Sequence, residues 1–407
     1  DYLDVYQYGD ADVRAGLRAP VHKRFGTAQY MKVAIATPPQ LPPAPRLRFQ
    51  RYGLSSARAR ELLTAMPRPD LILVTSSFTY TYLGVHDAIA LLRDMFPGIP
   101  IWLGGVYAQL CGAHATAHAG ADRVLAVTDI REIVQDVSRT LHCQTPTPAA
   151  WRTFCGLPAP ALDLYHTLAY MPLRTSCGCT RCCAYCSTPT LYPAFEERSW
   201  QAVLAELETV LARHTIRDVA FYDDALLVNA AQRLVPLLEQ VVARGWRLRF
   251  HVPNALHIHL VTPRLAALMR AAGFETIRLG LETCDEQRLR ATGAKYEKDD
   301  LTSCLTALMQ AGFRHEQIGA YILVGLPGQT LAEVRATIAY VRLEHGIRAK
   351  LAEYSPLPGS GLWPAAVAES RVPIADEPLW QNNSLLGSRS PVFTDEVIAS
   401  LRLEASR

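Results

Sequence analysis

Three cysteines near the middle of the chain have a spacing that suits metal chemistry. Cys179, Cys183 and Cys186 follow one another as C-x3-C-x2-C, in a segment that we expect to form a loop after a strand. Their three thiolates are one fewer than the four that a cubane iron–sulfur cluster normally takes. A cluster held by these residues would therefore keep one iron free to bind another molecule.

Zinc and disulfides are the alternatives for this segment, since residues 177–186 hold five cysteines. A structural zinc site usually has four ligands in paired short spacings, and such spacings do not recur among the other five cysteines, which are scattered singly. Disulfides need an oxidising compartment, whereas scattered single cysteines are typical of a reduced cytosolic protein. The spacing therefore favours an iron–sulfur cluster and a cytoplasmic location.

Composition indicates a multi-domain enzyme. A chain of 407 residues suggests two or three domains, and no apolar run approaches the ~20 residues of a membrane-spanning helix. A net charge of +3 is too balanced to indicate nucleic acid or an anionic membrane as a partner. Residues 1–6 have the pattern of a strand already under way, so we expect the chain to be a fragment.

The first third of the chain predicts a doubly wound, Rossmann-like α/β domain over residues 1–140. Apolar runs predict buried parallel strands, and helices are expected near 56–66, 84–95, 107–119 and 129–140. The predicted strands are Lys32–Thr37, Asp70–Thr75, Ile101–Gly104 and Arg123–Val127. In such sheets ligands bind beyond the carboxyl ends of the strands, which here are the loops 75–80 and 104–107.

A Pro-rich linker over residues 141–168 separates this domain from a second βα series. The series predicts a partial, TIM-like (β/α)6 barrel over 169–371, followed by a C-terminal extension over 372–407. Strands are expected at 170–176, 217–222, 247–252, 275–281, 317–324 and 348–354. Helices are expected at 198–213, 229–244, 263–272, 285–292 with 298–312, and 330–344. Chemistry in such barrels sits at the carboxyl ends of the strands.

Polar residues follow several of these predicted strands. Asp223 and Asp224 follow the second strand, and two adjacent carboxylates there require a cation nearby, although one of them could instead cap a helix. Asn254 follows the third strand and Glu282 the fourth, where Arg278 can hold a carboxylate with two hydrogen bonds. A lone His251 or His257 is more often a hydrogen-bonded barrel residue than a catalyst.

Together these motifs resemble the radical S-adenosylmethionine (SAM) superfamily, in its B12-binding branch. The Gly-x-x-Gly turn of residues 325–328 and the Ser-Pro-x-Pro-Gly stretch of 355–359 are similar to its adenine-binding segments. The resemblance implies a [4Fe-4S] cluster on the three cysteines, whose open iron chelates SAM and whose electron cleaves it to a 5′-deoxyadenosyl radical. It also implies SAM contacts from Tyr185, Asp223, Asp224, Asn254, Glu282, Leu323, Gly325, Ser355 and Pro356.

The first domain resembles the cobalamin-binding domain of that branch, although its Asp-x-His-x-x-Gly motif is absent. The cobalamin contacts implied are Ser76, Ser77, Thr79, Tyr80, Gly104, Gly105, Val106 and Tyr107. The alternative is a domain kept as scaffold or substrate cover.

The resemblance implies an enzyme that starts radical chemistry at a C–H bond of a small-molecule substrate, with an external electron donor of the ferredoxin or flavodoxin type. Bound cobalamin would make the reaction C-methylation, and without it rearrangement, ring formation or oxidation is expected. The rival hypotheses are a non-catalytic iron–sulfur protein, a zinc-stabilised scaffold and a degenerate enzyme.

Overall fold

The computed structural model describes residues 32–41, 49–126, 129–144, 147–165, 168, 170–293, 295–385 and 391–406. The strand predicted at residues 1–6 lies outside these ranges, as do residues 145–146 and 166–167 of the predicted linker and residue 169 of the predicted barrel. The chain divides into two compact units, residues 1–127 with 135–145 and residues 128–134 with 146–407. Among the described residues no helix is both long and apolar enough to cross a membrane.

The smaller unit contains a parallel sheet of three strands, β3 (Ile72–Ser76), β4 (Ile101–Gly105) and β5 (Arg123–Val124), in that order. The central strand is the most buried, since Ile101, Trp102 and Leu103 are at most 5% exposed. Helices near the sheet in sequence are α2 (Ser56–Thr64), α3 (Tyr82–Met95), α4 (Val106–Leu110), α5 (Gly112–His118) and α6 (Ile130–Thr140). The single helix predicted at 107–119 is thus two helices that meet at Cys111.

The prediction that Lys32–Thr37 forms a buried parallel strand is wrong. Only Lys32–Ala34 forms a strand, β1, and it pairs antiparallel with β2 (Gln50–Tyr52) in a separate sheet. Ile35 is 45% exposed. An apolar run indicates that a strand forms but not its partner, and the partner here is a polar strand that places β1 outside the parallel sheet.

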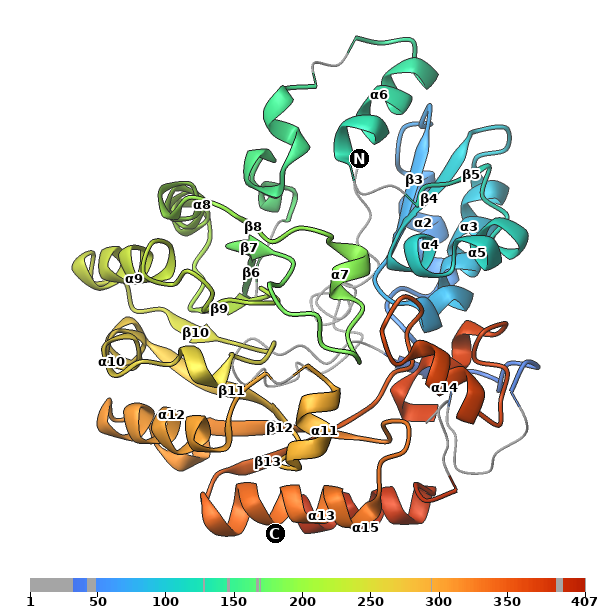
Figure 1. The fold of residues 1–407 in the computed structure, drawn as a ribbon. Helices are drawn as coiled ribbons and strands as arrows, with labels where there is room; N and C mark the ends of the chain where they lie inside the picture. Colours follow the sequence, from blue (N-terminus) through green and yellow to red (C-terminus); the bar gives the residue numbers. More distant parts are fainter. Residues whose placement is uncertain are drawn as a thin grey trace. The chain divides into compact units, whose positions relative to one another are not determined.

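The larger unit contains the predicted six parallel strands, ordered as they follow in the chain. Helices line the outer side of this sheet (Figure 1), which is the arrangement of a partial TIM-like barrel. The strands are β6 (Met171–Leu173), β9 (Asp218–Phe221), β10 (Arg249–His251), β11 (Phe274–Glu282), β12 (Ile318–Val324) and β13 (Arg348–Glu353). The prediction differs at 170–176, where β6 is followed by a short strand β7 (Ser176–Cys177) that pairs antiparallel with β8 (Glu196–Glu197).

The helices of this unit also follow the predicted order. They are α7 (Thr188–Leu191), α8 (Trp200–Arg213), α9 (Leu234–Ala243), α10 (Pro263–Ala272), α11 (Glu286–Ala291), α12 (Lys298–Gln310), α13 (Leu331–Ala339), α14 (Trp363–Glu369) and α15 (Asp395–Ser406). A π-helical turn, Tyr340–Glu344, continues α13. Several helices begin at a side-chain cap, such as Ser199 before α8 and Thr262 before α10, each of which accepts a hydrogen bond from a backbone N–H.

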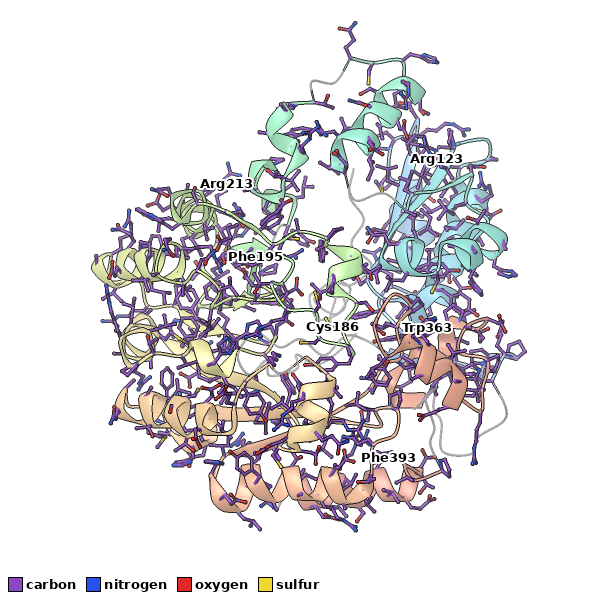
Figure 2. The ribbon with its side chains drawn as sticks, viewed as in Figure 1. Arg123, Cys186, Phe195, Arg213, Trp363 and Phe393 are labelled. Atoms are coloured by element: carbon purple, nitrogen blue, oxygen red, sulfur yellow. The ribbon has the colours of Figure 1, made fainter. Side chains whose placement is uncertain are left out.

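The six strands divide their side chains between two faces. Ile277, Leu279 and Leu281 of β11 are fully buried in one core with residues of the surrounding helices. Because side chains alternate along a strand, Arg278, Gly280 and Glu282 point to the opposite, inner face of the sheet. Figure 2 shows Cys186 on this inner side, in the loop that carries the three cysteines.

Candidate functional site

The cysteine loop lies at the carboxyl end of the barrel and is tied down on both sides. The backbone N–H of Ala184 donates to the carbonyl of Thr292, and the carbonyl of Ala184 accepts from Leu362 at 2.7 Å. Gly293, at φ +120°, lies against the loop, because a Cβ there would lie 3.3 Å from Cys183 Cα. The loop conformation is therefore fixed by segments far away in the chain.

Backbone donors face two of the three sulfur atoms. The N–H of Arg181 lies 3.4 Å from Cys179 Sγ, and the N–H of Thr188 lies 3.4 Å from Cys186 Sγ. Burial raises the pKa of Cys179 and of Cys183, so a bound cation is needed to hold these two as thiolates. Donors aimed at sulfur are the means by which proteins set the potential of an iron–sulfur cluster.

The donor set fits a cluster better than one zinc ion. Within the described ranges, no three His, Cys, Asp or Glu side chains are grouped closely enough to hold a single metal ion. A cubane spreads its ligands, because each thiolate binds a different iron. The three cysteines lie in one loop, with backbone donors aimed at two of the sulfur atoms. Two C-x2-C pairs, as in structural zinc sites, would also need Cys182, and that side chain is exposed.

Tyr185, between two of the cysteines, has a buried hydroxyl group that makes no hydrogen bond. Burial raises the pKa of this hydroxyl, and the nearby Glu282 carboxylate adds to the effect. A buried polar atom without a partner costs free energy in the folded protein. Its position beside the cysteines suits a residue that meets a bound ligand.

Asp223 and Asp224 have different environments, although both were predicted to contact SAM. Asp223 is 2% exposed and accepts hydrogen bonds at 2.6 to 3.2 Å from the backbone N–H and hydroxyl groups of both Thr175 and Ser176. Arg233 Nη1 lies 3.4 Å from the same carboxylate. Most of these contacts reach Oδ1, so this oxygen is fully used and Asp223 fastens the start of the cysteine loop to β9.

Asp224 keeps an acceptor available. Its Oδ2 is buried without a hydrogen bond, and the nearest cation, Arg174 Nη2, lies 3.6 Å away. Burial raises the pKa of Asp224, and Arg174 opposes that effect. A carboxylate in this state gains from an added cation such as an ammonium group, so the structure favours Asp224 over Asp223 as a ligand contact.

Glu282 ends β11 and pairs with a lysine that sequence analysis missed. Its φ of +68° is rare for a residue other than glycine, and its Oε1 lies 3.3 Å from Lys295 Nζ. A Cβ at Gly280 would lie 2.5 Å from the same Nζ, so glycine is required to make room for the ammonium group. Burial lowers the pKa of Lys295, but Glu282 and the thiol of Cys183 outweigh it, and the pKa is raised overall.

Asn254, predicted to face SAM or the substrate, lies beside the aspartate pair. Its side-chain amide donates to the backbone carbonyl of Asp223 at 3.2 Å. Asn254 thus links the exits of β9 and β10, and the structure brings it together with Asp224 at the carboxyl end of the barrel.

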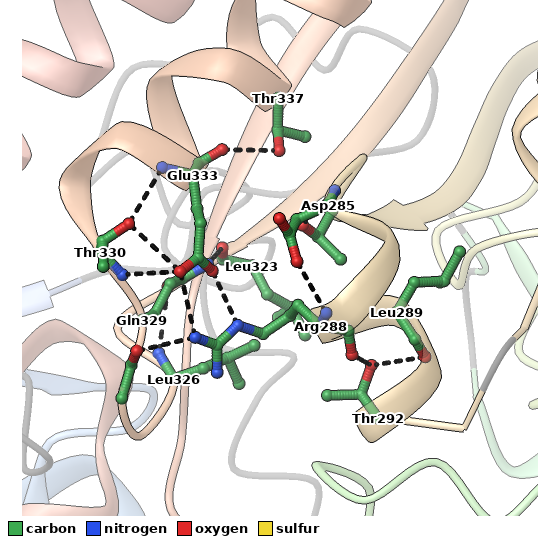
Figure 3. Close-up of polar contacts among 12 residues, drawn as sticks. Asp285, Arg288, Leu289, Thr292, Leu323, Leu326, Gln329, Thr330, Glu333 and Thr337 are labelled. Carbon is green, nitrogen blue, oxygen red and sulfur yellow. Dashed lines mark hydrogen bonds and ion pairs between the residues drawn. The ribbon is translucent and has the colours of Figure 1, made fainter.

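The Gly-x-x-Gly turn after β12 is held by three side chains that sequence analysis missed (Figure 3). Gln329 accepts from the N–H groups of Gly325 and Leu326 and donates to the carbonyl of Leu323. Arg288 of α11 donates to two carbonyls of the turn and pairs with Glu333 at 2.8 Å. Gly325 has a φ of +88°, which explains the glycine there.

The Ser-Pro-x-Pro-Gly stretch begins directly after β13. The N–H of Tyr354 donates to the carbonyl of Val324 at 2.8 Å, so Ser355 and Pro356 leave the sheet beside the end of β12. Pro356 is buried and Ser355 half-buried. The two predicted adenine segments, which include Leu323 and Gly325, are therefore neighbours at the same edge of the sheet.

A cleft of about 350 Å³ lies beside the cysteine loop. It is lined by Thr180, Arg181, Val228, Asn229, His257, His259 and Leu260. His257 Nε2 lies 3.9 Å from Cys179 Sγ, and burial lowers the pKa of His257 to about 3. His257 is therefore a neutral neighbour of the candidate cluster, whereas His251 is bonded to Asp218 and Thr276 within the barrel.

The predicted cobalamin residues gather at the carboxyl ends of β3 and β4, but several already have partners. Ser76 Oγ donates to the carbonyl of Gly104 and accepts from the N–H of Tyr107 at 2.9 Å. Gly105 has a φ of +87°, and a Cβ there would lie 2.3 Å from Ser76 O. These contacts fix the β4–α4 turn.

The remaining predicted residues vary in their exposure. Thr79 is 1% exposed, and its hydroxyl has no hydrogen bond. Ser77 is exposed, Val106 is half-buried, and the ring of Tyr80 stacks on Phe78. Thr79 is thus the residue of this group with a buried polar atom that a ligand could satisfy.

Tyr107 belongs to a histidine cluster that sequence analysis missed. Its hydroxyl lies 2.6 Å from His114 Nδ1 and 3.2 Å from His86 Nε2, and the His114 ring contacts the His118 ring. Burial, with His114 and His118 nearby, lowers the pKa of His86 to about 4. The H-x3-H spacing of His114 and His118 was a signal in the sequence that could have indicated this cluster.

Comparison with known proteins identifies the larger unit. Residues 173–341, which include the cysteine loop and the strands β9, β10, β11 and β12, match the family model described as the Radical SAM superfamily. This part of the barrel is similar to a radical SAM domain. Its cysteine spacing and barrel strands are therefore features that the chain shares with that superfamily.

Two relatives represent the curated proteins that match. The chain is 27% identical over 292 residues to a hopanoid C-2 methylase of Rhodopseudomonas palustris, covering 66% of this chain and 54% of the relative. It is 25% identical over 327 residues to a tRNA-2-methylthio-N(6)-dimethylallyladenosine synthase of Frankia casuarinae, covering 74% and 58%. The chain thus spans little more than half the length of each relative.

A solved structure shares the fold at low sequence identity. It is the radical SAM methyltransferase TsrM from Kitasatospora setae with cobalamin and a [4Fe-4S] cluster bound, with a TM-score of 0.63 and 16% identity. The match covers 76% of this chain and 68% of that one. The similarity supports the parallel α/β architecture of the radical SAM domain.

Proposed function

We propose that this chain is an enzyme that cleaves SAM reductively and starts radical chemistry at a substrate C–H bond. The observation that carries the proposal is the group of unsatisfied polar atoms around the cysteine loop. The Tyr185 hydroxyl and Asp224 Oδ2 are buried without hydrogen bonds, next to three cysteines that fit a cluster. A purely structural metal site would not require these groups.

When bound, a [4Fe-4S] cluster supplies the electron that converts SAM to methionine and a 5′-deoxyadenosyl radical. Cys179, Cys183 and Cys186 would hold that cluster, with backbone N–H groups aimed at two of the sulfur atoms. Cys183 is buried, whereas Cys179 and Cys186 are half-buried. The chain's own residues thus bind and orient both groups.

Specific residues would hold the parts of SAM. The Asp224 carboxylate would accept from the ammonium group, and the Lys295 ammonium, beside Glu282 and the cysteines, is the buried cation available to a carboxylate. The turn held by Gln329, with Leu323, Gly325, Ser355 and Pro356, would bind adenine. Asp223 would keep the loop in place and not touch SAM.

A more specific proposal is that the smaller unit binds cobalamin and that the reaction is C-methylation. The methylase activity in the names of the hopanoid relative and of TsrM supports it, as does the buried, unbonded hydroxyl of Thr79. Ser76 and Tyr107 are already hydrogen-bonded to other groups of the protein, so their role is structural. Absorption titration with hydroxocobalamin tests the proposal, and an unchanged cobalamin spectrum would leave rearrangement, ring formation or oxidation.

The proposed organisation is a Rossmann-like domain over 1–140, a linker over 141–168, the radical SAM barrel over 169–371 and an extension over 372–407. We propose a cytoplasmic location, an external electron donor and a small-molecule substrate. The Frankia relative acts on tRNA by its name, so RNA is the competing substrate class.

Product analysis tests the main proposal. Reconstituted, dithionite-reduced protein incubated with SAM is expected to release 5′-deoxyadenosine, and the Cys183→Ala variant is expected to release none. Cys182→Ala is the matched control, because Cys182 is exposed in the same loop. A cluster-loaded protein that binds SAM but forms no 5′-deoxyadenosine would contradict the proposal.

A further inference from the structure

Three cations lie on the inner face of the barrel sheet, away from the cysteines. Arg278 is on β11, and Arg348 and Lys350 are on β13. Their neighbours along each strand, Ile277 and Ala349, belong to the core shared with the outer helices. Because side chains alternate, the three cations point inward.

Two of the side chains converge over a glycine. Gly319 of β12 is the register partner of both Arg278 and Arg348. A Cβ at Gly319 would lie 3.5 Å from Arg278 Nη1 and 3.4 Å from Lys350 Cγ. Because Gly319 has no side chain, β12 leaves a gap between the side chains of Arg278 and Lys350. A Cβ at this position would fill that gap.

The guanidinium of Arg278 is held in position. Its Nη1 donates to the carbonyl of Ile277 at 2.9 Å and to that of Gln317 at 3.4 Å. Backbone carbonyls orient this group but carry no net charge, so its positive charge is not neutralised. The Tyr321 side chain also interacts with the guanidinium but is neutral, so an oxyanion that binds there would meet an uncompensated charge.

No carboxylate neutralises this group of cations. Among the described residues, none of the three is in an ion pair, whereas Arg249 on the neighbouring strand β10 pairs with Asp218. Burial lowers the pKa of Lys350, and Arg278 and Arg348 lower it further; burial also lowers the pKa of Arg278. Like charges on one face cost free energy unless an anion joins them.

We propose that Arg278, Arg348 and Lys350 bind a phosphate or pyrophosphate group of a small-molecule substrate on the inner face of the sheet. The inference rests on the proposed radical SAM function and names the substrate class for it. A group with two or more negative charges matches three cations better than one carboxylate does. Glu282 lies four positions after Arg278 on β11, which is at most about 13 Å at ~3.3 Å per residue. The anion would therefore lie within about that distance of the SAM end.

Calorimetry with inorganic pyrophosphate tests this inference on the reconstituted full chain. The double variant Arg278→Gln/Lys350→Gln is expected to weaken binding at least 10-fold. Gly319→Ala is expected to weaken it too, because the methyl group enters the gap without changing the charge. The control is Arg264→Gln, which removes a cation of α10 that is 80% exposed and paired with Glu239 of α9. It is expected to bind like the wild type.

The outcomes separate this inference from the proposed function. Equal pyrophosphate binding by all variants, or no binding by the wild type, would overturn the phosphate site even if the cluster and SAM binding are intact. If a short single-stranded RNA binds more tightly than pyrophosphate and the same variants weaken its binding, the phosphate group would belong to RNA and not to a small-molecule substrate. Electron paramagnetic resonance (EPR) of the same samples reports the cluster independently, so a protein without a cluster would count against the proposed function alone.

Discussion

The carboxyl ends of the two parallel sheets differ in how their polar groups are satisfied. At the ends of β6 and β9, Tyr185 and Asp224 keep buried atoms without partners. At the ends of β3 and β4, Ser76 and Tyr107 are already hydrogen-bonded within the protein. Both sheets have strand ends of the type at which ligands bind, but only the barrel leaves several polar groups for a ligand to meet.

The difference teaches that position in a fold and readiness for a ligand are separate properties. The barrel has strand ends of the type at which ligands bind and also buried polar groups without partners, so its chemistry can be argued from its own residues. The smaller unit also has parallel strand ends where a ligand could bind, but chiefly Thr79 and Gly104 are available there to contact one. Its proposed cofactor depends more on the relatives than on the site.

The largest expected effect is the loss of the cluster. Cys183→Ala removes the buried middle ligand of the C-x3-C-x2-C spacing, so reconstituted protein is expected to lose most of its iron and sulfide. Cys182→Ala is expected to keep both, because Cys182 is exposed and outside the C-x3-C-x2-C spacing. Iron and sulfide analysis measures the effect, and equal loss in both variants would contradict the assigned ligand set.

The aspartate pair is the next test. Asp223→Asn removes a charge that accepts several hydrogen bonds and faces Arg233, so a loss of about 3–5 kcal/mol in the free energy of unfolding is expected. Asp224→Asn is expected to change stability by less than about 1 kcal/mol and to weaken SAM binding about 10-fold, since a hydrogen bond to a charged group contributes ~1.5–3 kcal/mol. Urea unfolding measures the stability of each variant, and calorimetry measures SAM binding. If Asp224→Asn unfolded more easily and Asp223→Asn bound SAM more weakly, Asp223 would be the SAM contact and Asp224 the structural residue.

The six barrel strands could be predicted from the sequence because their apolar residues lie between turn residues, either in a run as in β12 or alternating with polar residues as in β11 and β13. The cysteines could be predicted because their spacing is local. Lys295, Gln329 and Arg288 could not, because their roles come from contacts made by folding, such as the pair of Arg288 with Glu333 45 residues away. The prediction for Lys32–Thr37 failed for the same reason. A single apolar run in the sequence does not show with which other strand it will pair.

The pair of Lys295 and Glu282 is expected to show coupling. Lys295→Met leaves Glu282 without its cation, and Glu282→Gln leaves the ammonium without its carboxylate, so each single change destabilises the barrel. The double variant is expected to lose less unfolding free energy than the two single variants lose together, by about 1–3 kcal/mol. Denaturant unfolding of the four proteins measures this value, and additive effects would mean that the pair contributes nothing.

The smallest expected effect is in the histidine cluster of the smaller unit. His86 has a pKa of about 4 when folded, below its ordinary 6.5. Between pH 6.5 and 4 the unfolded chain binds a proton at His86 that the folded chain does not, so stability falls as pH decreases through this window and is constant above it. Melting temperatures at pH 7.5 and 5 are expected to differ less in His86→Gln than in the wild type. An identical pH effect in both would contradict the role of His86.

The most direct test of the radical SAM assignment is EPR of the reduced, anaerobically reconstituted protein with and without SAM. The account predicts a cluster signal that shifts when SAM is added. In Asp224→Asn the signal should remain and the shift should require about 10-fold more SAM. A cluster signal that ignores SAM at any concentration, or a protein that binds zinc and forms no cluster, would contradict the account.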